Sequence, residues 1–176
     1  MFPAFVIHHN STTERKDLVD DIVKKTGAIQ FQSYLLQDRV VGCTFSHIGV
    51  AKLARSMFPD KSYLVFEDDC VLLDDWDYIV KTFPDYDILY LGYNSRTPDK
   101  VFGTHALYIS PKGRDAIISL AEGQVEEVFR KEPYDWLLSD LCREKGLSVC
   151  IPKVEMKDNW CVQKKGLVSL ITGKER

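Results

Sequence analysis

Short apolar runs of strand length alternate with longer amphipathic stretches along most of the chain. The runs that we predict as strands are Phe5–Ile7, Ala28–Phe31, Tyr63–Phe66, Ile88–Leu91, Thr104–Ile109 and Leu147–Ile151. Between them, apolar residues recur at helical spacing. We predict helices over residues 11–27, 42–58, 76–83, 111–121 and 134–145. This alternation is typical of an α/β sandwich with a mostly parallel central sheet.

Start and stop signals support several of these boundaries. Ser11 and Glu14 have the spacing of a capping box, and Gly27 is a natural helix stop. Ser110 precedes Pro111, so a capping residue stands before a proline at a first helical position. The segment 94–102 is the best candidate for a mobile loop, and the pattern past residue 152 is ambiguous.

Composition and charge narrow the class of protein. A chain of 176 residues is long enough for one sizeable core, so we expect a single domain over residues 1–176. The net charge of -3 and the pI near 5.8 argue against a nucleic-acid-binding protein. The five cysteines form no Cys-x-x-Cys pair, which favours reduced thiols. Because we find neither a signal peptide nor an apolar segment long enough to span a bilayer, we expect a cytoplasmic protein.

Three consecutive carboxylates, Glu67, Asp68 and Asp69, follow the apolar run 63–66. Such a run is typical of a buried parallel strand, and ligands bind at the carboxyl ends of these strands. In an extended chain Glu67 and Asp69 would face one way and Asp68 the other. Adjacent anions need a countercharge, and oxygen ligands suit Mg2+ or Mn2+. The alternative is a solvated acidic surface, since further aspartates follow at positions 74, 75 and 77.

Two further segments carry candidate binding residues. The start of the second predicted helix would favour anions, so Ser46 and His47 could meet a phosphate there. The small residues Gly103 and Thr104 permit close approach of a ligand, and His105 could bind a metal or touch a sugar. Each segment has a structural alternative, in which Ser46 caps locally and the two histidines are packed, hydrogen-bonded side chains.

Asp135 stands in the first turn of the last predicted helix. A helix N-terminus favours the ionised carboxylate, so Asp135 should be anionic at neutral pH and could accept a proton. The same placement also stabilises a helix without any chemistry. Its position alone therefore leaves both interpretations open.

Taken in order along the chain, these motifs resemble those of glycosyltransferase family 25, which contains bacterial lipooligosaccharide galactosyltransferases and procollagen galactosyltransferases. The matching positions are Arg15, then Gly42, Cys43, Ser46 and His47, then Glu67-Asp68-Asp69, then Gly103 to Gly113, and finally Pro133 with Asp135. The resemblance covers roughly residues 5–155, and its motifs are more specific jointly than singly. The chain departs from the family at His8-His9-Asn10, where an Asn-Leu pair is usual, and it is short for the fold.

The resemblance implies a GT-A fold, a Rossmann-like α/β/α sandwich in which an acidic motif holds Mn2+ on the diphosphate of a nucleotide sugar. By the same resemblance, Glu67 and Asp69 are the metal ligands, with Mg2+ as the alternative ion, and Asp135 is the catalytic base of an inverting transfer. Asp68 is expected to contact the sugar or the ribose. The other residues expected to bind the donor are Ser46, His47, Gly103, Thr104 and His105.

These expectations lead to a metal-dependent glycosyltransferase. It would move a hexose, galactose or glucose, from a UDP-sugar to the hydroxyl of a glycan, lipid-linked or protein acceptor. Two alternatives stay open: a nucleotide-sugar-binding module or inactive homologue without transfer activity, and a metal-dependent phosphohydrolase, since clustered carboxylates also serve that chemistry. The sequence indicates no nucleic-acid partner and no membrane span, and it predicts no particular oligomeric state.

Overall fold

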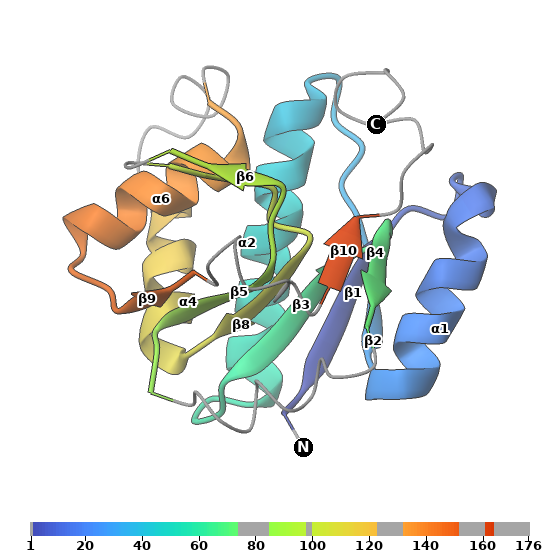
Figure 1. The fold of residues 1–176 in the computed structure, drawn as a ribbon, viewed down its shortest axis with the longest axis horizontal. Helices are drawn as coiled ribbons and strands as arrows, with labels where there is room; N and C mark the ends of the chain where they lie inside the picture. The colour runs from blue at the N-terminus through green and yellow to red at the C-terminus, as the bar shows by residue number, and fades with distance from the viewer. Residues whose placement is uncertain (1, 74–84, 98–99, 123–131, 152–160, 164–176) are drawn as a thin grey trace.

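The computed structural model describes residues 2–73, 85–97, 100–122, 132–151 and 161–163. The predicted helix over residues 76–83 and the aspartates at positions 74, 75 and 77 lie outside these ranges. Within the described residues, a central sheet is covered on both faces (Figure 1). All five cysteines are thiols rather than disulfide partners, as the sequence predicts.

The central sheet has six strands in the order β2-β1-β3-β8-β5-β9. Their bounds are β1 Ala4–His8, β2 Ile29–Gln32, β3 Tyr63–Glu67, β5 Ile88–Gly92, β8 Ala106–Ile109 and β9 Val149–Cys150. β1 is parallel to both β2 and β3, and β5 is parallel to β9. The predicted α/β class with a mostly parallel sheet is therefore confirmed.

β8 is the exception, because it runs antiparallel to both of its neighbours, β3 and β5. Between β5 and β8, the short strands β6 Ser95–Arg96 and β7 Val101–Phe102 pair with each other. A connection of this kind contains no helix, and antiparallel strands can be joined without a helical crossover. The expected mobile loop at residues 94–102 thus contains a small ribbon on either side of residues 98 and 99.

The first helical region differs from the prediction at its start. A 3-10 turn η1 over Thr13–Arg15 leads into α1, Lys16–Thr26, and no side chain caps either start. The predicted capping box is wrong, because the Ser11 hydroxyl pairs instead with the ring of His9, at 2.6 Å. The predicted stop is right: Gly27 ends α1 at φ 69, a left-handed conformation that favours glycine.

The second helix, α2, runs over Arg39–Met57 and begins three residues before the predicted start at residue 42. The carboxylate of Asp38 caps it, accepting hydrogen bonds from the backbone N–H groups of Val40 and Val41. Residues 42–47 consequently lie inside the helix, where backbone N–H groups are bonded within it. The predicted anion site at a helix start in this segment is therefore wrong.

Two more helices follow β8. α4 spans Pro111–Ser119, with the Ser110 hydroxyl accepting a hydrogen bond from the N–H of Gly113, so the predicted cap is confirmed. A 3-10 turn η2, Leu120–Glu122, extends it. α6 spans Tyr134–Glu144 and begins directly after Pro133.

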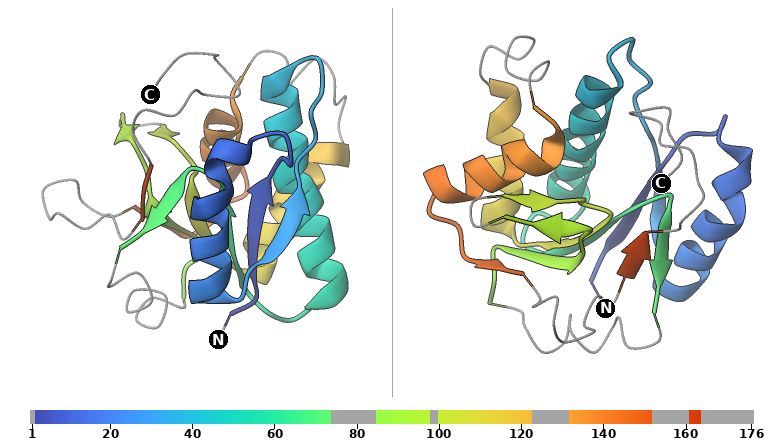
Figure 2. Two further views of the ribbon diagram at one scale, coloured as in Figure 1. Left: turned by 90° about the vertical axis from the view of Figure 1, so that its right-hand side faces the viewer. Right: turned by 45° about the horizontal axis from the view of Figure 1, so that its top comes forward.

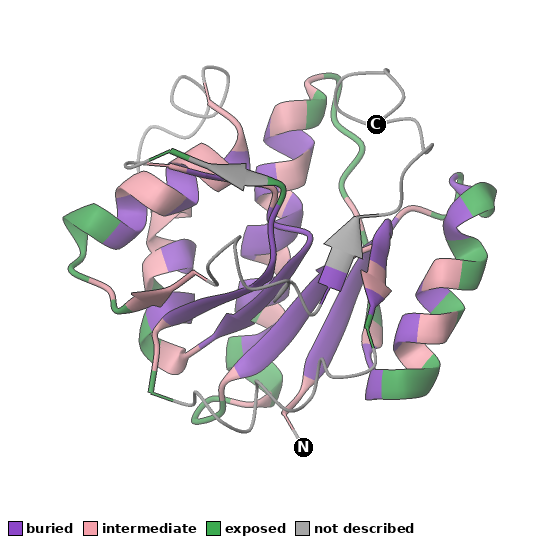
Figure 3. Cartoon of the chain, in the orientation of Figure 1, coloured by how far each residue is buried: buried purple, intermediate pink, exposed green. Residues whose placement is uncertain are grey.

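The two faces of the sheet have separate apolar cores. On one face, alternate strand residues such as Phe5 and Val65 pack against α2, α4 and α6. On the other, residues such as Val6 and Phe66 pack against α1 and against a ribbon of β4, Cys70–Leu72, and β10, Cys161–Gln163. Figure 2 shows these layers from two further sides. The inner strands β1, β3, β5 and β8 are buried along most of their length, whereas the edge strands β2 and β9 and the outer sides of the helices are more exposed (Figure 3). Among the helices of the described ranges, we find no candidate for a membrane span.

Candidate functional site

The candidate residues gather where β1 and β3 end and β8 begins. Glu67 is the last residue of β3, and Asp68 and Asp69 form the turn that follows it. Because β8 runs the opposite way, its start lies at the same edge, and the Glu67 N–H donates to the His105 carbonyl across the two strands, at 2.9 Å. The carboxyl edge of a parallel sheet is the usual place for a ligand.

Glu67 lies between a helix and the start of β8. Its Oε1 accepts a hydrogen bond from the Thr104 hydroxyl at 3.1 Å and lies 3.3 Å from Nε2 of His47. His47 comes from the middle of α2 and is 2% exposed, whereas the Glu67 side chain is 23% exposed. One carboxylate therefore joins two of the predicted donor-binding residues and still reaches the surface.

Asp135 is held at the same edge by backbone groups. Its Oδ2 accepts a hydrogen bond from the N–H of Gly103 at 2.9 Å, and its Oδ1 accepts one from the N–H of Trp136 at 3.0 Å. Gly103 has φ 86, a conformation that side-chain-bearing residues rarely adopt. Since Gly103 contacts Asp135 and the next residue, Thr104, contacts Glu67, this dipeptide brings the two carboxylates together.

The pKa of Asp135 is raised above its ordinary value. Burial is the largest cause, the hydrogen bonds from Gly103 and Trp136 oppose it, and the negative charge of Glu67 raises the pKa further. The helix N-terminus favours the ionised form of Asp135, but desolvation outweighs that effect in the fold, and the prediction that Asp135 is anionic at neutral pH stays a prediction. A raised pKa brings a carboxylate closer to the range in which it is an effective proton acceptor.

Asp68 is surrounded by donors from the end of β1 and from η1. His8 Nδ1 lies 3.1 Å from its Oδ2, the Thr12 hydroxyl donates to the same oxygen at 3.3 Å, and Arg15 donates to Oδ1. Asp68 and Arg15 are 5% and 4% exposed. These contacts anchor the turn after β3 to the start of α1, and the expected contact of Asp68 with a sugar or ribose stays a prediction.

Asp69 approaches the same arginine, with 3.7 Å between its Oδ2 and Nη1 of Arg15. The strict alternation predicted for the three carboxylates is therefore wrong. It stops at Glu67, because residues 68 and 69 form a turn, and Asp68 and Asp69 share one partner. Burial alone would lower the pKa of Arg15, but the two aspartates outweigh it and the pKa is raised, which keeps the guanidinium charged. The sequence analysis expected a metal ion to balance the charge of the three carboxylates. Arg15 supplies part of that positive charge.

Two of the predicted residues have partners that hold the fold together. The Ser46 hydroxyl donates to the carbonyl of Gly42 at 2.7 Å and accepts from the N–H of Tyr34 at 2.9 Å, which ties the segment after β2 to α2. His105 is 1% exposed, and its Nε2 lies 3.3 Å from the carbonyl of Cys161 in β10. Both contacts agree with the structural alternatives, and a role of either residue in donor binding stays a prediction.

Three residues have contacts that the sequence does not predict, although Arg15 and Cys43 stand at positions that match the family motifs. Arg15 and Thr12 reach Asp68 from more than fifty positions away, and no local pattern indicates that contact. Cys43 is different, because it lies four residues before His47 on a predicted helix, a spacing that places both on one face. The structure brings one ligand atom each of Cys43, His47 and Glu67 within 4.8 Å of one another. Among the described residues, this is the one group of three that could hold a metal ion.

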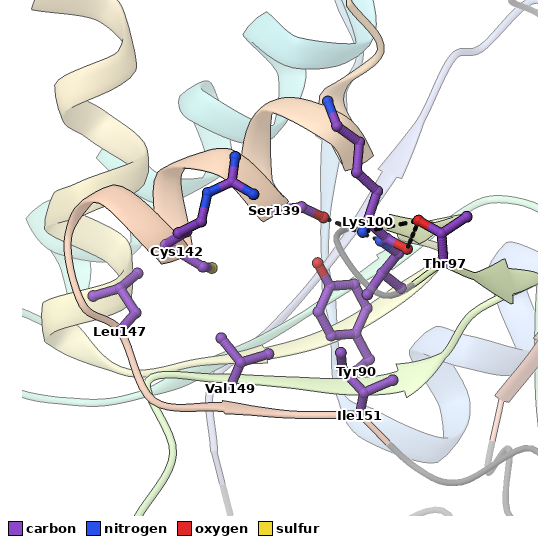
Figure 4. Close-up of a pocket in the computed structure, with 10 residues that line it drawn as sticks. Tyr90, Thr97, Lys100, Ser139, Cys142, Leu147, Val149 and Ile151 are labelled. Atoms are coloured by element: carbon purple, nitrogen blue, oxygen red, sulfur yellow. Dashed lines mark hydrogen bonds between the residues drawn. The ribbon is translucent and has the colours of Figure 1, made fainter.

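A cavity of about 280 Å³ opens beside α6, on the side of β5 and β9. Figure 4 shows Tyr90 pointing from β5 toward α6, near Ser139. The Ser139 hydroxyl donates to the Asp135 carbonyl and accepts from the N–H of Val101, so the cavity wall is continuous with the turn that carries Asp135. The cavity is lined by Tyr90, Thr97, Lys100, Val101, Ser139, Cys142, Arg143, Leu147, Val149 and Ile151. None of the predicted site residues lines it.

No family model and no curated protein matches this sequence. Among solved structures, the chain is similar to a glycosyltransferase involved in the glycosylation of the major capsid of PBCV-1, with a TM-score of 0.62, 13% sequence identity and 92% of each chain covered. It is also similar to A197 from STIV, with a TM-score of 0.50, 14% identity, and coverage of 93% of this chain and 82% of that chain. At these identities the likeness concerns the fold, which is the glycosyltransferase-like α/β fold that the motifs predict.

Proposed function

We propose that this protein is a family 25-type glycosyltransferase that moves a hexose, galactose or glucose, from a UDP-sugar to an acceptor hydroxyl with inversion. The observation that carries the proposal is the meeting of Asp135 and Glu67 through Gly103 and Thr104 at the carboxyl edge of the sheet. The fold likeness to the PBCV-1 glycosyltransferase supports it. The acceptor would be a glycan, lipid-linked or protein hydroxyl, and the proposed place of action is the cytoplasm.

Asp135 is the proposed base. As the acceptor oxygen attacks the anomeric carbon, its proton passes to the Asp135 carboxylate while the bond from that carbon to the diphosphate oxygen breaks. A single displacement inverts the configuration and leaves the sugar on the acceptor and UDP as the leaving group. The raised pKa of Asp135 and its fixed orientation by two backbone N–H groups suit this role.

Glu67 and Asp69 are the proposed ligands of a divalent ion, Mn2+ or Mg2+. Such ions need one or two protein carboxylates, since waters and the donor's phosphates complete their coordination. The ion would neutralise charge that develops on the departing diphosphate. Arg15, which contacts Asp69, would add a second positive charge beside it. His47 and Thr104 contact Glu67, and Gly103 contacts Asp135, which supports their proposed place near the donor, and Asp68 stands between the two proposed ligands in the sequence.

Asp69→Ala tests the metal assignment. We expect UDP release from the UDP-sugar with Mn2+ to fall about 100-fold, because the variant loses a proposed ligand of the ion that would stabilise the leaving diphosphate. The matched control is Asp60→Ala, since Asp60 is exposed after α2 and lies before β3 rather than after it. Equal turnover in Asp69→Ala and the wild type would contradict the assignment. Binding of UDP without any release would favour a nucleotide-sugar-binding module instead.

The pH dependence tests the role of Asp135. The base must be ionised, so kcat/KM should fall as the pH drops through the pKa of Asp135 in the free enzyme. Because that pKa is raised, we expect the acid limb of the kcat/KM profile at a higher pH than the pKa range of an ordinary aspartate. Glu67 contributes to the rise, so Glu67→Gln should move the acid limb to lower pH, whatever its effect on the rate itself. If the acid limb of the kcat/KM profile lies at the same pH in Glu67→Gln and in the wild type, that limb reports the ionisation of a group other than Asp135.

A further inference from the structure

Cys43, His47 and Glu67 bring three different kinds of metal ligand to one point. Cys43 and His47 stand one turn apart on α2, and Glu67 ends the strand that packs beside this helix. One ligand atom of each lies within 4.8 Å of the other two. An ion with bonds of about 2.0–2.3 Å holds its ligands roughly 3–4 Å apart, so only small side-chain rotations separate this arrangement from a closed site.

The His47 ring is held beside Glu67. It is 2% exposed, and its Nε2 lies 3.3 Å from Oε1 of Glu67. The two ring nitrogens point in different directions, so an ion bound jointly by His47 and Glu67 takes the lone pair of Nε2, and Nδ1 then carries the ring proton. The ion would thus replace the direct contact between the imidazole and the carboxylate with a bond to each.

The orientation of the ring is set before any ion arrives. His47 stacks on Tyr134 with 4.0 Å between the ring centroids and 12° between the planes. Tyr134 is itself buried at the start of α6, next to Asp135. Cys43 and Glu67 are half-buried, so an ion can reach the site from the surface. The site is therefore both pre-oriented and accessible.

We propose that Cys43, His47 and Glu67 bind one Zn2+-class transition-metal ion in the protein without nucleotide sugar. A thiolate and an imidazole select Zn2+ or Co2+ over Mg2+, which prefers oxygen ligands throughout. Three protein ligands leave a fourth position for water, as in open zinc sites. This inference goes beyond the proposed transfer reaction, because it concerns binding of the ion alone. The two share Glu67 as a proposed metal ligand and His47 as a residue near the donor.

Co2+ is the probe that tests the site directly. Chelator-treated protein is titrated with Co2+, and the thiolate-to-cobalt charge-transfer absorption is followed in the absence of any nucleotide. We expect one equivalent to bind, with displacement by Zn2+ and not by Mg2+. Cys43→Ser should abolish the absorption, and His47→Gln should weaken Co2+ binding by about 100-fold or more, since loss of a direct ligand costs at least as much as loss of a group that orients one. Cys150→Ser, in the partly buried strand β9, is the matched control and should bind as the wild type does.

A measurement on the wild-type chain guards against variants that fail to fold. Zn2+ should slow alkylation of Cys43 by iodoacetamide, located by mass spectrometry, and should leave the rate at the partly exposed Cys150 unchanged. The proposal is overturned if the cobalt absorption persists in folded Cys43→Ser, or if Zn2+ does not protect Cys43 in the wild type. Neither readout depends on sugar transfer, so both can fail while the proposed function stands, and the reverse also holds.

Discussion

Asp135→Asn is expected to lower kcat by about 100- to 10,000-fold, the usual contribution of a positioned general base. The substitution keeps the size of the side chain, and the amide oxygen can still accept the hydrogen bond from the N–H of Gly103. What it removes is the capacity to take the proton of the acceptor hydroxyl, together with the oxygen that accepts the hydrogen bond from the N–H of Trp136. Because donor binding does not need that proton transfer, KM for the UDP-sugar should change little. Steady-state kinetics with saturating Mn2+ and acceptor measure both constants.

Asp140→Asn is the matched control for this experiment. Asp140 lies on the same helix and pairs with Lys100 and Arg143, away from Gly103. We expect its kcat to stay within about twofold of the wild-type value, which corresponds to a small change in the activation barrier. A comparable loss in both variants, or an unchanged kcat in Asp135→Asn, would show that Asp135 is not the base. Thermal unfolding of each variant separates a catalytic loss from a loss of folded protein.

Arg15→Ala is expected to destabilise the protein by about 3–5 kcal/mol, because it leaves Asp68 and Asp69 without their shared cation. The arginine is 4% exposed, so water cannot replace the guanidinium without rearrangement. For a chain of this size the change corresponds to a fall in Tm of roughly 6–20 °C. Urea unfolding followed by circular dichroism gives the free energy of unfolding.

Three further variants define the cause of this loss. Arg143→Ala removes an arginine whose side chain is 62% exposed, and it should cost no more than about 1 kcal/mol. Arg15→Lys keeps the charge without the planar fork, so its stability should lie between those of the wild type and Arg15→Ala. Adding Asp68→Asn to Arg15→Ala should recover part of the loss, because it removes one uncompensated charge. If Arg15→Ala is no more destabilising than Arg143→Ala, the ion pair is not important for stability.

The elements with a strong local signal could be predicted from the sequence. The apolar run 63–66 predicted a buried strand, and Glu67 lies at its carboxyl end as expected. Ser110 before a proline predicted the start of α4. The start of α2 was misplaced although a signal was present, since Asp38 is a good capping residue that stands directly before the observed helix.

The parts of the site that depend on distant contacts could not be predicted in this way. The side chain of Asp69 can face either Glu67 or Arg15, depending on the backbone turn at residues 68 and 69. The residue types in the acidic run do not predict that turn. The direction of the Asp135 pKa shift depends on burial, which only the packed fold reveals. The resemblance of the ordered motifs to a known family suggested the function that we propose, whereas the local patterns gave the positions of candidate residues without indicating which residues they contact.

The reversed direction of β8 places the residues that contact the two carboxylates before the strand, whereas in a parallel strand they would follow it. Buried residues 106–109 set the register of this strand with both neighbours, while residues 103 and 104, which contact the two carboxylates, come before it in the chain. Changes between β6 and β7 could therefore alter the surroundings of these two carboxylates without shifting the pairing of β8 with β3 and β5. Under the proposed function, exchange of residues 93–102 between related chains would test whether this segment influences the choice of acceptor.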